Sequence, residues 1–187
     1  GYPPQDLLWE KQFVEENLNI LYQISSITTI PLIVGYVRKD AKNIYNSVAI
    51  CYQGKIRSSY DKILLPSYDV FDEERYFSSG LKPKVSMVPW KNRKVKIGLQ
   101  ICEDLWDKDY SCNVTKHQMQ LGAEIFINVS ASPYHKNRLV NRRSIIKEKV
   151  SQTNTPFLYC NAVGAQDELI FDGQSMAFSK DGNMIAY

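Results

Sequence analysis

The sequence predicts a layered α/β fold, and three observations support this prediction. Between residues 95 and 163, apolar strand-like runs alternate with helical segments in the order strand, helix, strand, helix, strand. That alternation is typical of an α/β sheet. Thr155-Pro156 lies between the second helix and the third strand of this series, where a proline is expected to end the helix. The first strand ends at a cysteine followed by two carboxylates, at the sheet edge where open α/β folds carry their chemistry.

The composition is that of a soluble globular protein. The chain has 187 residues, 44% of them hydrophobic and 23% charged, which fits one domain of ordinary size. The net charge of +3 is evenly spread, and no basic run is interleaved with aromatics, so nucleic acid is not an expected partner. No apolar stretch approaches the roughly 20 residues that cross a bilayer, and no signal-peptide pattern is present.

The four cysteines predict a reduced, intracellular protein. Cys51, Cys102, Cys112 and Cys160 form no CxxC pair, and the chain has only two histidines, so a zinc site is not expected. Cys51 and Cys160 lie in apolar strand-like runs and are expected in the core. Cytoplasm is therefore the expected location.

The first part of the chain is expected to form a helix and a set of strands. A Pro-rich turn enters a helix that continues to about residue 26, with apolar residues at roughly helical spacing. Strands are predicted at residues 31–37 and 45–52. Gln53-Gly54-Lys55 is a hairpin turn, so the strand that follows it should pair antiparallel with residues 45–52.

Residues 60–80 are rich in aromatics and charges and show no period. A loop of this length inside a compact domain is usually functional or disordered. The aromatic content argues against disorder. We therefore expect a functional loop here.

From residue 95 the pattern is regular. The expected elements are a strand at 95–101, a helix near 112–121, a strand at 124–130, a helix near 139–152, a strand at 157–163 and a closing hairpin of residues 175–178 and 184–187. In the second helix, Leu139, Ile146 and Val150 form one apolar stripe.

Cys102 is the candidate nucleophile for acyl transfer. An unperturbed thiol has a pKa of about 8.5, so it needs activation at neutral pH. A cation such as Lys62 would favour the thiolate and the tetrahedral oxyanion, the backbone N–H of Glu103 could be a second oxyanion donor, and a carboxylate would act as general base. The two histidines favour this arrangement over a papain-like one, because His117 is expected on a helix face, although the loop residue His135 could pair with a thiol. A buried core cysteine is the alternative.

At these residues a resemblance to a known family emerges. The runs that carry it are Lys62-x-x-Leu65-Pro66-x-Tyr68, Phe71-Asp72-Glu73-x-Arg75-Tyr76-Phe77 and Ile101-Cys102-Glu103-Asp104-x-Trp106. Three further runs, at residues 1–7, 128–135 and 166–173, agree in the same order. Together they resemble the nitrilase (carbon–nitrogen hydrolase) superfamily, and within it the glutaminase domains of glutamine-dependent NAD synthetases.

The resemblance implies a nitrilase-type α-β-β-α sandwich with a Glu–Lys–Cys triad. Cys102 matches the nucleophile, Lys62 the lysine, and Glu73 an additional glutamate of the loop. The positions at which the family contacts glutamine are Tyr68, Glu103, Ser132 and Arg138. Simpler alternatives are a solvated loop charge for Glu73, an exposed lysine for Lys62 and a surface charge at a helix start for Arg138.

One departure from the family concerns the general base. In the family, the base glutamate lies a few residues before the Gly-Tyr-Pro-Pro run, whereas this sequence starts at Gly1. We therefore expect residues 1–187 to be an N-terminally incomplete fragment of a glutaminase domain, with the C-terminal synthetase domain absent. ATP and Mg²⁺ would belong to that absent domain, since the sequence has no GxxxxGK[ST] run, and no cofactor is expected in this one.

The expected function is hydrolysis of the glutamine side-chain amide through a cysteine thioester. The ammonia would serve ATP-dependent amidation of nicotinic acid adenine dinucleotide in NAD biosynthesis. Expected partners are L-glutamine, the synthetase domain and further copies of the chain in a homo-oligomer, with neither nucleic acid nor membrane. Two alternatives remain open: a stand-alone nitrilase-like amidase, and a catalytically inactive fragment.

Overall fold

The computed structural model describes residues 2–187, and their contacts divide the chain into two compact units. One unit contains residues 3–82, and the other contains residues 83–187 together with Tyr2. The sequence run at residues 1–7 includes Gly1, which lies outside the described residues.

The unit of residues 3–82 contains one long helix and one antiparallel sheet. Its elements are the 3₁₀ helix η1 (Gln5–Trp9), the helix α1 (Lys11–Ile27) and the strands β1 (Leu32–Lys39), β2 (Ile44–Tyr52) and β3 (Lys55–Asp61). The strands lie in the order β1-β2-β3, and both pairs are antiparallel. The predicted helix and the predicted hairpin of β2 and β3 are confirmed.

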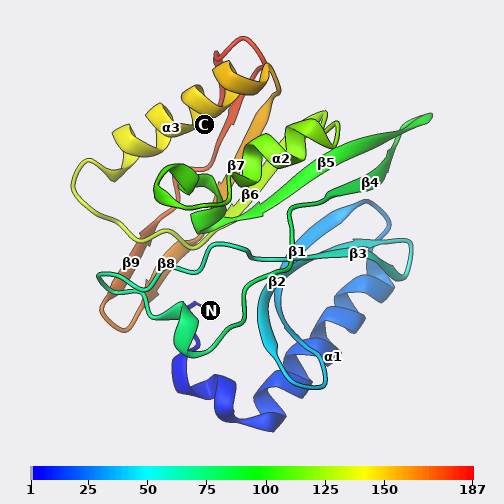
Figure 1. Cartoon of the computed structure of the whole chain (residues 1–187). Coiled ribbons are helices and arrows are strands. Elements are labelled where there is room, and N and C mark those ends of the chain that lie inside the picture. The colour runs from blue at the N-terminus through cyan, green and yellow to red at the C-terminus, as the bar shows by residue number, and fades with distance from the viewer. Residues whose placement is uncertain (1) are drawn as a thin grey trace. The chain divides into compact units, whose positions relative to one another are not determined.

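Helix α1 lies along this sheet (Figure 1). It buries Val14, Leu21 and Ser25, which recur at the spacing that brings residues onto one helical face. Leu21 packs with Ala49 and Cys51 of β2 in one core cluster, and Cys51 is fully buried, as predicted. The apolar stripe of α1 therefore explains why this helix covers this sheet.

The loop after β3 is irregular but ordered by backbone hydrogen bonds. Between β3 and residue 84 its only helical segment among the described residues is the 3₁₀ helix η2 (Glu73–Arg75). The N–H of Glu73 donates to the carbonyl of Pro66 (3.1 Å), and the N–H of Gly80 donates to the carbonyl of Lys62 (2.8 Å). The loop thereby folds back on itself.

The unit of residues 83–187 is built on a mixed six-stranded sheet with the order β11-β10-β7-β6-β5-β4. The strands are β4 (Val85–Trp90), β5 (Arg93–Ile101), β6 (Ile125–Ser130), β7 (Phe157–Asn161), β10 (Met176–Phe178) and β11 (Met184–Ala186). The central strands β5, β6 and β7 are parallel and are joined through α2 (Val114–Gln120) and α3 (Arg138–Thr153). The predicted alternation of strands and helices is confirmed.

Helices α2 and α3 lie along one face of this sheet (Figure 1). Phe126 of β6 and Phe157 of β7 place their ring centroids 5.9 Å apart, and both are fully buried. Ile146 and Val150 of α3 pack on them with no exposed surface, as the predicted stripe requires. This core holds α3 against β6 and β7. The polar residues of the candidate site lie at or near the carboxyl ends of the parallel strands.

Two strand pairs were not predicted. Strand β4 pairs antiparallel with β5, and β8 (Val163–Gln166) pairs antiparallel with β9 (Leu169–Asp172) in a separate two-stranded sheet. Pro89 lies inside β4, which is possible because β4 is at the edge of the sheet, where a missing backbone donor is tolerated. None of the helices formed by residues 2–187 combines the length and apolarity that crossing a membrane requires.

The expectation that Cys160 lies in the core is wrong, because its side chain is exposed. In β7 the buried residues are Phe157, Tyr159 and Asn161, so Cys160 falls on the opposite face of the strand. An apolar run predicts a strand but does not tell which of its faces is covered.

The Gly98→Ala variant is expected to be destabilised by about 1 to 3 kcal/mol through overpacking. A Cβ at Gly98 would lie 2.7 Å from the ring of Phe126 and 2.8 Å from Oε1 of Gln118. Gly35→Ala in β1 is the matched control, because nothing lies within 4 Å of its Cβ position. Urea unfolding of both variants measures the difference, and equal stabilities would contradict the close packing of β5.

Candidate active site

Cys102 lies at the carboxyl end of β5 and begins the 3₁₀ helix η3 (Cys102–Leu105). Its φ angle of +43° is in the left-handed region, which a residue with a side chain adopts at a cost of about 1 to 2 kcal/mol. The carboxylate of Asp104 accepts a hydrogen bond from the N–H of Ile101 (3.0 Å), just before the cysteine. A side-chain hydrogen bond therefore restrains the sharp turn from strand to 3₁₀ helix at the residue before Cys102.

Two polar side chains of β6 form the second restraint. Nδ2 of Asn128 donates to the backbone carbonyl of Cys102 (3.3 Å), and Oγ of Ser130 donates to Oδ1 of Asn128 (2.6 Å). Asn128 is fully buried, and Ser130 is also buried. Sequence reasoning missed both as residues that act on Cys102, although they lie in a run that carries the family resemblance.

Glu103 is buried beside the nucleophile, with 5% of its surface exposed. The hydroxyl of Tyr110 donates to Oε1 of Glu103 (3.0 Å). A carboxylate at this depth has to be compensated by hydrogen bonds or charge, and Tyr110 supplies one such bond. Glu103 is thus a buried, hydrogen-bonded carboxylate next to Cys102, and its contact with a substrate stays a prediction.

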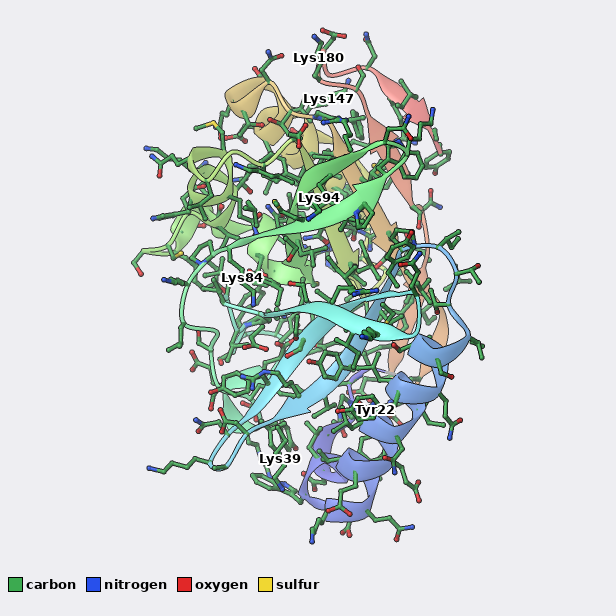
Figure 2. All side chains as sticks on the ribbon, turned by 90° about the vertical axis from the view of Figure 1, so that its right-hand side faces the viewer. Tyr22, Lys39, Lys84, Lys94, Lys147 and Lys180 are labelled. Atoms are coloured by element: carbon green, nitrogen blue, oxygen red, sulfur yellow. The ribbon has the colours of Figure 1, made fainter. Side chains whose placement is uncertain are left out.

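A buried ion pair supports the end of the turn. Lys149 of α3 donates to Oδ1 of Asp107, which lies in the 3₁₀ helix η4 (Asp107–Asp109), and both side chains are almost completely buried. Lys147, two residues earlier in the helix, is exposed (Figure 2). Lys149 is buried and Lys147 is exposed because the two side chains lie on different faces of α3.

Ser132 lies in a loop that Arg142 holds in place. Nη2 of Arg142 donates to the carbonyl of Ser132 (2.8 Å) and to its Oγ (3.2 Å), and Nη1 donates to Oδ1 of Asp172 (2.8 Å). Arg142 has no exposed surface, and Ser132 has 4%. The backbone N–H of Ser132 donates to Oδ1 of Asn161 (2.8 Å). Sequence reasoning missed Arg142, whose role becomes visible only through these long-range contacts.

Arg138 is the first residue of α3 and is half-buried. Its guanidinium carbon lies 5.2 Å from the ring centroid of Trp106, within the range of a cation–π interaction. Trp106 follows directly on η3. Arg138 thus lies beside Trp106, close to the turn that carries Cys102, and both its predicted contact with glutamine and the alternative of a charge at a helix start stay open.

Tyr159 of β7 is a further buried polar residue of this region, with 2% of its surface exposed. Burial raises the pKa of its phenol to about 12, and the neighbouring Cys102 acts in the same direction. The phenol is therefore protonated at neutral pH.

In the unit of residues 3–82, Lys62 and Glu73 form a buried ion pair. Nζ of Lys62 lies 2.7 Å from Oε1 and 2.8 Å from Oε2 of Glu73. The side chains are 1% and 4% exposed. The alternatives of an exposed lysine and a solvated loop glutamate are therefore wrong, because both residues are buried and bonded.

Tyr68, in the same loop, is the exposed member of the predicted set. It is 48% exposed, and its ring meets Phe71 edge to face with the centroids 5.7 Å apart. Of the predicted residues, the structure thus pairs Lys62 with Glu73 in one unit. In the other unit Glu103 follows Cys102 and Arg138 lies over Trp106, whereas Ser132 is held by Arg142 and Asn161. Among residues 2–187, no group of three or more His, Cys, Asp or Glu is arranged to hold a metal ion.

The other thiols are expected to differ in reactivity with iodoacetamide at pH 8. Burial raises the pKa of Cys51, and burial together with Asp104 and Asp107 raises that of Cys112, so both hold less of the reactive thiolate. Cys160 is exposed and should be labelled faster than either. Peptide mass spectrometry over time measures the order, and early labelling of Cys112 would contradict it.

Comparisons with known proteins show which family the sequence resembles. Residues 8–187 match the family model of carbon-nitrogen hydrolases. The chain is 39% identical to a glutamine-dependent NAD(+) synthetase of Synechocystis, over 99% of this chain and 35% of that protein. It is 37% identical to the Thermotoga maritima protein of the same description, over 100% of this chain and 32% of that protein.

Solved structures confirm the predicted nitrilase-type α/β fold. A glutamine-dependent NAD+ synthetase of Acinetobacter baumannii superposes with a TM-score of 0.87 and 32% identity, over 98% of this chain and 34% of that one. A carbon-nitrogen hydrolase of Helicobacter pylori gives a TM-score of 0.81 at 22% identity, over 97% and 65% of the two chains. The chain thus spans about a third of the length of the synthetases that it matches.

Proposed function

The chain belongs to the carbon-nitrogen hydrolase family, and from this membership we propose that it hydrolyses the side-chain amide of glutamine through a thioester on Cys102. The thiolate sulfur attacks the amide carbon, the carbon–nitrogen bond breaks, and ammonia leaves with a proton from the site. Water then attacks the γ-glutamyl thioester, which releases glutamate and restores the thiol.

The observation that carries this proposal is the position of Cys102 on a left-handed turn at the end of β5, next to the buried carboxylate of Glu103. A nucleophile on such a sharp turn projects from the edge of a sheet, and a carboxylate beside it can bind an ammonium group of a substrate. Glutamine carries an α-ammonium group. Relatives at 37% to 39% identity are glutamine-dependent NAD(+) synthetases, which supports glutamine over other amides.

Further roles come from the family resemblance. We assign Lys62 as the cation that stabilises the thiolate and the oxyanion, and Glu73 as the carboxylate that pairs with this lysine. Tyr68, Ser132 and Arg138 are the proposed further contacts of glutamine, and Arg138 would pair with its carboxylate. The ammonia would serve ATP-dependent amidation of nicotinic acid adenine dinucleotide by a synthetase domain, in a homo-oligomeric, cytoplasmic protein.

The test uses the natural full-length protein that contains this sequence. Incubation with a diazo-ketone analogue of glutamine should add one adduct to the intact mass, and the Cys102→Ala variant should add none. A parallel panel of glutamine, asparagine and simple amides measures substrate choice. Strong preference for glutamine is the expected result. Equal turnover of simple amides would indicate a general amidase, and an adduct without any hydrolysis would indicate an inactive protein.

A further inference from the structure

The backbone carbonyl of Cys102 is held by a side chain of the neighbouring strand. Nδ2 of Asn128 donates to this carbonyl at 3.3 Å, and Asn128 has no exposed surface. Asn128 is the register partner of Gln100 in the parallel pair of β5 and β6. This hydrogen bond therefore connects β6 to the backbone of Cys102, two residues beyond the register partner of Asn128.

The carbonyl of Cys102 decides which way the Asn128 amide faces, and Ser130 holds the other end of that amide. The Cys102 carbonyl can only accept a hydrogen bond, so the NH₂ end of the amide has to face it. The oxygen end then faces Ser130, whose hydroxyl lies 2.6 Å away and donates to it. The reversed amide would place two acceptor oxygens against each other, so this hydrogen-bond chain runs only from hydroxyl to amide to backbone carbonyl.

The planar peptide carries this restraint to the next residue. The C=O of Cys102 and the N–H of Glu103 belong to one trans peptide unit and point in opposite directions. A side chain that holds the carbonyl therefore also sets the direction of the Glu103 N–H. The left-handed φ of Cys102 makes such a restraint necessary, because strained backbone persists only where its surroundings impose it.

We propose that Asn128, held by the hydrogen bond from Ser130, is a positioning residue that aims the Glu103 N–H at the oxyanion formed during acyl transfer to Cys102. This inference rests on the proposed function. Asn128 acts through the peptide and does not itself touch the substrate. Its effect should thus appear only in reactions that develop a negative charge on an oxygen atom.

The experiment compares two reactions of the full-length protein. Hydrolysis of glutamine passes through a tetrahedral oxyanion, whereas alkylation of Cys102 by iodoacetamide displaces iodide from a saturated carbon and forms none. Removal of one oxyanion donor lowers kcat by about 10²- to 10³-fold in other enzymes. We expect Asn128→Leu to lower kcat by about 10- to 100-fold, because it misaligns that donor without deleting it. KM and the alkylation rate of Cys102 across pH should stay unchanged.

Two further variants make the comparison sharp. Ser130→Ala leaves only a small hole and should lower kcat by about fivefold, as expected for the loss of one orienting hydrogen bond. Gln118→Met is the matched control, because Nε2 of Gln118 donates to another backbone carbonyl of β5, that of Leu99, at 2.6 Å. It deletes a buried amide donor of α2 that binds a carbonyl of β5 but leaves the peptide of residues 102 and 103 untouched, so kcat should not change.

Each outcome decides between the hypotheses. Full kcat in Asn128→Leu and Ser130→Ala, with an active wild type, would overturn this inference and leave the proposed function intact. A parallel loss of hydrolysis and alkylation would also overturn it, because the residue would then assemble the thiol rather than the oxyanion site. A wild type that hydrolyses no glutamine would refute the proposed function, and this inference with it.

Discussion

The Lys62→Met variant is expected to lose about 3 to 5 kcal/mol of its free energy of unfolding, because it leaves the carboxylate of Glu73 buried without its cation. Nζ of Lys62 contacts both oxygens of Glu73, and each residue has less than 5% of its surface exposed. Methionine fills the space of the lysine stem but cannot compensate the charge. Urea unfolding at neutral pH measures the loss, and glutamine hydrolysis should disappear with it.

The double variant Lys62→Met/Glu73→Leu separates stability from catalysis. Replacing both members of a buried pair with apolar residues of similar volume is often neutral or stabilising. We therefore expect the double variant to recover most of the lost stability and to remain inactive. An active double variant would remove both residues from the proposed mechanism, and a single variant as stable as the wild type would contradict the burial of the pair.

The Cys102→Ala and Cys102→Gly variants should both lose glutamine hydrolysis, by about 10⁴-fold or more if the nucleophile behaves as those of other triads do. They should differ in stability. With φ at +43°, residue 102 is strained when it carries a Cβ, so Cys102→Gly should be about 1 kcal/mol more stable than Cys102→Ala. Urea unfolding of the two variants, with the same protein otherwise, measures this difference.

Cys112 provides the control for this comparison. Among the residues that the structure describes, those with positive φ do not include Cys112. Glycine at this position therefore brings only the entropic cost of a flexible backbone. Cys112→Gly should accordingly be less stable than Cys112→Ala, which is the opposite order. The same order at both positions would contradict the strained turn at Cys102.

The sequence was sufficient for the alternation of strands and helices from β5 to β7. These elements have apolar runs or stripes and are separated by turn residues, and these are local signals. The position of Cys102 followed from the same signals, because the apolar run stops at this residue. Lys62 and Glu73 were identified by their motif positions in a loop without any period, which the family resemblance supplied, but their buried ion pair was not predicted.

The rest depends on contacts between distant residues. Strand β4 contains Pro89, which lowers its strand signal, and only the edge position in the sheet makes the strand possible. Asn128 is 26 residues from Cys102, and Arg142 is 30 residues from Asp172. No local pattern links such pairs. Single-sequence reasoning therefore found the candidate nucleophile but not the side chains that hold its surroundings.

For enzyme engineering, the Arg142 network defines which segments have to be exchanged together. Arg142 reaches Ser132 and Pro133 in one loop and Asp172 at the end of β9 with a single guanidinium group. A loop transplanted from another carbon-nitrogen hydrolase around residue 132 would meet a buried arginine that connects three segments. Altering substrate range by grafting thus requires the loop, the first turns of α3 and the β8–β9 hairpin as one cassette.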